Sequence, residues 1–245
     1  GLGGVVLLLG GMHLLLQTET GATTAVQAIA AYANPLPNTT LTVERASGSW
    51  VGSLQLTNVT LLHTPPDGTP PRDTLAHADT LAAGYRLGPL LDGRLHLTEV
   101  TAAGPSLTMR QAPDSTWDWM RVLPVSEAPA DTGAAMPVQV DRVRVSEGQF
   151  RASFYAGGRD SIATVQDFTV RAANLRTAPT VEGRLDTLGM QAHLPGDDTP
   201  LRMGMSGLLS PTRLHLDTLR LTSPRSRVVG GGQAQLPSDP DRALD

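Results

Sequence analysis

From Thr39 onward, apolar and polar residues follow an eight-residue pattern that interrupts strict alternation once: apolar, polar, apolar, two polar, apolar, polar, apolar. Alternation with a period of two is typical of a β-strand that buries one face. The pattern therefore predicts a mostly β protein. The strict copies are Leu54–Leu61, Val138–Val145 and Leu214–Leu221, and looser copies with Ala or Gly at an apolar position begin near Ala76, Leu95, Ala163 and Gly183.

The second polar residue in the middle of each copy predicts a β-bulge. Strict alternation would send the last two apolar residues of a copy to the opposite face of the sheet, and one extra residue returns them to the first face. Successive copies lie about 20 to 25 residues apart, or about twice that, a spacing typical of a stacked strand-turn-strand unit. Each unit then presents one apolar face.

An antiparallel sheet with one apolar face has to cover that face with a second sheet or with helices. After Pro35 the sequence offers only a short helical candidate, Tyr85–Leu91. Two arrangements remain open, a closed sandwich and a sheet curled into a trough lined by Leu and Val. Periodicity does not choose between them, and general structural precedent favours the sandwich.

The stretch Gly1–Leu16 is apolar and carries no Asp, Glu, Lys or Arg. A bilayer-spanning helix needs about 20 such residues. We therefore expect residues 1–17 to be a transmembrane anchor that begins before Gly1, with a signal peptide as the alternative. Thr18–Ala33 is helix-compatible and Asn34-Pro35-Leu36-Pro37 ends it, which predicts a short helical stalk and turn over residues 18–38.

Composition and charge exclude several classes of protein. The chain has no cysteine, which excludes disulfides, thiolate metal sites and cysteine nucleophiles. Its net charge is −4, and its 19 basic residues, all Arg, are scattered along the chain. A nucleic-acid-binding protein needs a concentrated cationic surface, so no nucleic-acid partner is expected.

No motif for catalysis or metal binding stands out, so we expect neither an enzyme nor a cofactor. The histidines are isolated, and no pair of them has helical metal-ligand spacing or an adjacent carboxylate cluster. Gly230-Gly231-Gly232 lacks the Lys and Ser or Thr of a phosphate-binding loop. The histidines are His13, His63, His77, His96, His193 and His215.

Several segments together resemble the N-terminal region of the AsmA/TamB family of envelope proteins. Leu90–Val100, Gly104–Arg110 and Asp114–Trp119 are similar to the family's successive strands and turn, and Val43–Leu54 is similar to its first repeat. The order of anchor, stalk and strands also matches. Asp118, where the family often has Asn, and a Pro/Ala-rich insert at 112–137 depart from the pattern.

The resemblance implies a single inner-membrane helix followed by a repetitive antiparallel β-sheet curled into an elongated apolar trough in the periplasm. Residues 39–111 would form the first repeats and residues 138–245 further ones. The family is linked to phospholipid transport towards the outer membrane, and its TamB branch also to assembly of outer-membrane proteins with a barrel partner. Phospholipid acyl chains, the inner membrane and an outer-membrane barrel are thus the implied partners.

The apolar positions of the repeats are the candidate groove-lining residues, and a plain core is the alternative role for each. For the whole chain, lipid conduction competes with assembly of outer-membrane proteins by strand addition, and with a secreted β-sandwich or β-solenoid adhesin. The candidates are Leu54, Leu56, Val59, Leu61, Leu95, Leu97, Val100, Val138, Val140, Val143, Val145, Leu214, Leu216, Leu219 and Leu221.

Overall fold

The computed structural model describes residues 23, 39–49, 52–63, 73–111, 117, 137–156, 159–177, 180–195 and 199–235. The predicted anchor and all of the predicted stalk except Thr23 lie outside this set. Within these ranges, no helix is both long enough and apolar enough to cross a bilayer.

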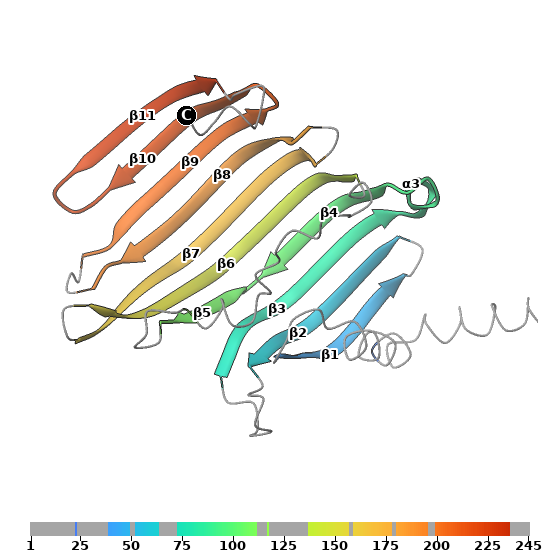
Figure 1. Cartoon of the computed structure of the whole chain (residues 1–245), viewed down its shortest axis with the longest axis horizontal. Coiled ribbons are helices and arrows are strands. Elements are labelled where there is room, and N and C mark those ends of the chain that lie inside the picture. The colour runs from blue at the N-terminus through green and yellow to red at the C-terminus, as the bar shows by residue number, and fades with distance from the viewer. Residues whose placement is uncertain are drawn as a thin grey trace, which may run out of the picture.

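The described chain is mostly β, as the alternating pattern predicts, and its 11 strands form one sheet (Figure 1). The short helix α3 (Leu87–Leu91) joins two of them, close to the predicted helical candidate. The strands are β1 (Thr39–Ser49), β2 (Ser53–His63), β3 (Asp73–Arg86), β4 (Leu95–Ala103), β5 (Ser106–Arg110), β6 (Val138–Ala156), β7 (Arg159–Arg176), β8 (Glu182–His193), β9 (Leu201–Ser210), β10 (Arg213–Thr222) and β11 (Arg227–Gln235).

Neighbours in the sheet follow the chain, in the order β1-β2-β3-β4-β6-β7-β8-β9-β10-β11. Strand β5 continues the line of β4, since β3 and β6 each pair with both. The break between them falls at Gly104, which has φ 57°, and Pro105. A Cβ at Gly104 would meet the Asp79 carboxylate, which is the movable end of a side chain, so the positive φ is the main reason that glycine is favoured here.

One pairing departs from the predicted antiparallel sheet. Strands β4 and β5 both run parallel to β6, whereas all other neighbours are antiparallel. Parallel neighbours require the chain to return to the end where the first strand began. The chain leaves β5 at Arg110 and enters β6 at Val138, so that return is made between these two residues. The Pro/Ala-rich insert, except for Trp117 and Pro137, lies outside the described residues.

Apolar residues line up in rows across the whole sheet. Residues directly opposed on neighbouring strands carry their side chains on the same face. We call two such rows the central rows. The first contains Ala46, Leu56, Leu81, Ala102, Val145, Val170, Leu188, Met205, Leu219 and Gly230. The second contains Gly48, Leu54, Ala83, Val100, Val143, Ala172, Leu185, Gly207, Leu216 and Gly232.

The predicted bulge is present at the paired polar residues. In the third strict copy, β10 shifts its register against both neighbours beside Asp217. In the first copy, Asn58 has φ 49° and its pairing is interrupted on both sides. The register of β2 against β1 and β3 is the same before and after Asn58, because each of these neighbours has two consecutive polar residues opposite it. In the second copy, the register between β6 and β4 has no shift, and the register shift lies instead between β4 and β3.

Few side chains of this sheet are fully covered. The buried hydrophobic residues in the described ranges are small apart from Leu75, and most candidate lining residues are half-buried. A sandwich needs two sheets, whereas all the described strands belong to a single sheet. The buried set is Val43, Ala46, Val59, Leu75, Ala78, Ala152 and Ala172.

The left-handed conformation at Asn58 generates a prediction. Replacing Asn58 with Val should destabilise the fold by about 1–2 kcal/mol more than replacing it with Gly, because a β-branched residue strains this region and glycine does not. Denaturant unfolding of both variants measures the difference. The neighbouring Thr57 is not left-handed, so Thr57→Val should lower the free energy of unfolding less than Asn58→Val does. Equal losses would show that the left-handed conformation at the bulge is not the cause.

Candidate functional site

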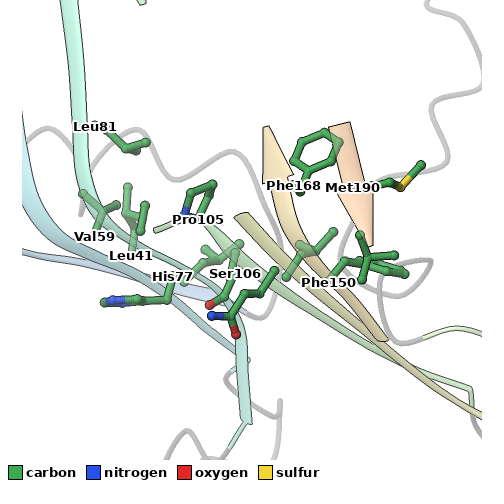
Figure 2. Close-up of a pocket in the computed structure, with 15 residues that line it drawn as sticks. Leu41, Val59, His77, Leu81, Pro105, Ser106, Phe150, Phe168 and Met190 are labelled. Carbon is green, nitrogen blue, oxygen red and sulfur yellow. The ribbon is translucent and has the colours of Figure 1, made fainter. Parts of the chain in front are cut away.

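A cavity of about 700 Å³ lies on the face that carries the apolar rows. Val59 of β2 and Leu81 of β3 lie on one side, and Phe168 of β7 and Met190 of β8 lie on the other (Figure 2). These strands are separated in the sheet by β4, β5 and β6. The sheet therefore curves around the cavity, which we call the first pocket.

The first pocket is almost wholly apolar. A row flanking the central rows supplies much of its lining, namely Leu41, Leu61, Ala76, Leu107, Phe150 and Val165. Its polar lining residues are Ser106, Gln149 and His77, and the His77 ring points away from the cavity towards Thr60 and Asp79 (Figure 2). Such a surface binds by exclusion of water rather than by directed hydrogen bonds, and its volume is in the range that holds a small apolar ligand.

A second pocket of about 450 Å³ lies on the same face, farther towards β10. Leu175, Met205, Leu209 and Leu214 are among its apolar lining residues. Its members Ala172, Leu185 and Leu216 belong to a central row, and Val170 and Leu188 of the other central row lie between the two pockets. An apolar surface thus joins the pockets.

The basic residues Arg176 and Arg184 are among those that line the second pocket. Arg176 also lines another cavity, of about 500 Å³, together with Arg94, Leu95 and Val138. Arg176 lies 3.0 Å from the Glu182 carboxylate, and both side chains are partly exposed. A surface ion pair of this kind contributes little to stability.

The candidate lining residues all lie in rows on one face. Val59 is buried, Leu214 is 46% exposed, and the others are half-buried. Val59 and Leu61 line the first pocket, and Leu214 and Leu216 line the second. Leu54, Leu56, Val100, Val143, Val145 and Leu219 belong to the central rows, Leu97 opposes Val140, Leu95 opposes Val138, and Leu221 opposes Met203.

Sequence reasoning missed the aromatic part of the first pocket. Phe150 lies beyond the end of a strict copy, on the same strand. Val165 and Phe168 belong to the looser copy that begins at Ala163, where the polar pair Gln166-Asp167 marks the bulge. Extending the pattern along β6 and accepting Ala at its first position would have identified all three.

The opposite face carries paired polar side chains, and here one expectation is wrong. The histidines are not all isolated, because His77 lies 3.2 Å from Asp79, His96 lies 2.9 Å from Asp141, and His215 lies 3.0 Å from Asp217. In each pair the histidine holds the second position of the eight-residue pattern and the aspartate holds the fourth. The two residues belong either to one copy or to copies on neighbouring strands. No group of three or more metal-ligating residues occurs among the described residues.

Comparisons with protein-family models, with curated proteins and with solved structures find no match for this chain. The AsmA/TamB resemblance therefore stays a prediction that rests on the order of its sequence motifs.

The His96 pair generates a pH prediction. Its hydrogen bond lowers the pKa of Asp141 below the usual 3.8, helped by Gln139 and the charge of Arg86 and opposed by burial. The carboxylate therefore adds stability that is complete above the ordinary pKa and lost as the pH falls through the lowered one. Wild type should exceed Asp141→Asn in free energy of unfolding above about pH 5, and the difference should close near pH 2. Denaturant titrations across this range test it, and a pH-independent difference would contradict it.

Proposed function

We propose that this chain conducts phospholipids between an inner and an outer membrane, with their acyl chains held along a hydrophobic β-groove. The observation that carries the proposal is the apolar face itself. The central rows cross every strand position of the sheet, and two apolar pockets open on that face.

The energetics suit a long acyl chain. Each buried methylene is worth about 0.8 kcal/mol, so a 16-carbon chain that leaves water gains roughly 12 kcal/mol. The rows repeat the same Leu, Val, Ala and Gly chemistry from strand to strand, so a bound chain meets a similar environment at each step. Similar energies along the path allow movement, whereas directed hydrogen bonds would hold a ligand at one place.

The proposed location rests on the resemblance and on the apolar stretch at residues 1–17. In this proposal residues 1–17 anchor the protein in the bacterial inner membrane and the sheet lies in the periplasm. The polar pairs on the opposite face, such as His215 with Asp217, are then the surface that meets water.

A matched pair of carboxylates tests the groove. Leu188 lies half-buried in a central row between the two pockets, and its neighbour Thr187 is exposed on the opposite face. Leu188→Asp should abolish most phospholipid transfer, because a charge there has to be desolvated against each passing acyl chain. Thr187→Asp should leave transfer near the wild-type rate.

The measurement is transfer of a fluorescent phosphatidylethanolamine from donor to acceptor phospholipid vesicles by the purified full chain. Circular dichroism and unfolding midpoints establish that both variants keep the sheet. Equal transfer by folded Leu188→Asp and Thr187→Asp would refute the groove as the path.

A further inference from the structure

Four arginines gather on the polar face of the sheet, opposite the apolar rows. Arg142 and Arg144 belong to β6, Arg171 to β7 and Arg184 to β8, three strands that are neighbours in the sheet (Figure 1). Arg144 lies directly opposite Arg171, and Arg142 and Arg184 both lie opposite Ala173. We call these four arginines the arginine cluster. It is a local positive region on a chain whose net charge is −4.

A cavity of about 300 Å³ lies within the arginine cluster. Arg142, Arg144 and Arg171 line it, together with Asp186 of β8. The cationic side chains therefore border a shared space. One small ligand in that space can contact more than one guanidinium group.

Carboxylates balance only part of the positive charge. Asp186 lies 2.5 Å from Arg184, and Glu99 of β4 lies 3.5 Å from Arg144. In both pairs each side chain is at least 35% exposed, so these contacts are screened by water. Four arginines against two carboxylates leave the cluster with two positive charges in excess.

Arg142 and Arg171 carry that excess. Within the part of the chain that the structure describes, neither of them forms an ion pair. Like charges directly opposite on neighbouring strands destabilise a sheet, as with Arg171 and Arg144. The other neighbours of this pair in the same row are Thr101 and Thr187, which carry no charge. A bound anion would offset the repulsion.

We propose that the arginine cluster binds a phosphate group. A phosphate carries about two negative charges at neutral pH, which matches the excess, and its oxygens accept paired hydrogen bonds from guanidinium groups. A carboxylate fits less well, because it carries one charge and has two oxygens, which a single arginine can engage. The site lies on the face opposite the groove and does not depend on lipid conduction.

Isothermal titration calorimetry of the full chain with inorganic phosphate, at constant ionic strength, tests the site. Arg171→Gln should weaken phosphate binding about tenfold or more, because it removes one charged donor pair. The matched control is Arg220→Gln, which removes the same charge from an exposed arginine of β10 on the same face and should bind as wild type does. Acetate should bind at least about tenfold more weakly than phosphate.

A second variant, Arg142→Gln, removes the other unpaired arginine from a different strand and should weaken phosphate binding to a similar degree. Circular dichroism establishes that each variant keeps the sheet. Absence of phosphate binding by wild type, equal weakening by Arg171→Gln and Arg220→Gln, or equal binding of acetate would each overturn the proposal, since the attraction would then be absent or diffuse.

Flotation of the full chain with phosphatidylcholine vesicles that contain or lack phosphatidic acid distinguishes two sources of the phosphate group. A gain in flotation with phosphatidic acid that Arg171→Gln removes and Arg220→Gln keeps would assign the site to a lipid headgroup. Equal flotation with both vesicles, together with Arg171-dependent binding of inorganic phosphate, would assign it to a soluble phosphate.

Discussion

The apolar face of this sheet depends on bulges that stay in step from strand to strand. Because the side-chain period of a strand is two, one uncompensated extra residue would move every later side chain to the opposite face. Neighbouring strands carry their paired polar residues at the same level, as at Asn58, or shift register to compensate, as beside Asp217. The rows of apolar side chains remain continuous for this reason.

Keeping the rows on one face has two consequences. The described residues form a single sheet, so the rows stay partly open to solvent, and two apolar pockets lie on the face that carries them. The polar residues that cause the bulges gather on the other face, where three histidines lie beside aspartates. One sequence pattern thus produces an apolar face on one side of the sheet and a polar face on the other.

The strands, the bulges and the apolar face were predictable because each follows from the local alternation of residue types. The parallel pairing of β4 and β5 with β6 was not, because alternation of residue types does not indicate in which direction neighbouring strands run. The Asp79 carboxylate lies beside Gly104, a contact between distant residues that alternation does not supply either. The pairing of His96 with Asp141 also needs the register of two strands, which alternation does not supply.

Site-specific photocrosslinking in cells tests the central claim that the rows contact lipid. Photoreactive residues at Val140 and Leu216, on well-separated strands of the apolar face, are compared with one at Arg220 on the opposite face, and radiolabelled phospholipid is then detected on the purified protein. Lipid adducts at both apolar positions and not at Arg220 are the predicted result. Absence of adducts at Val140 and Leu216, in protein that is folded and abundant, would contradict it.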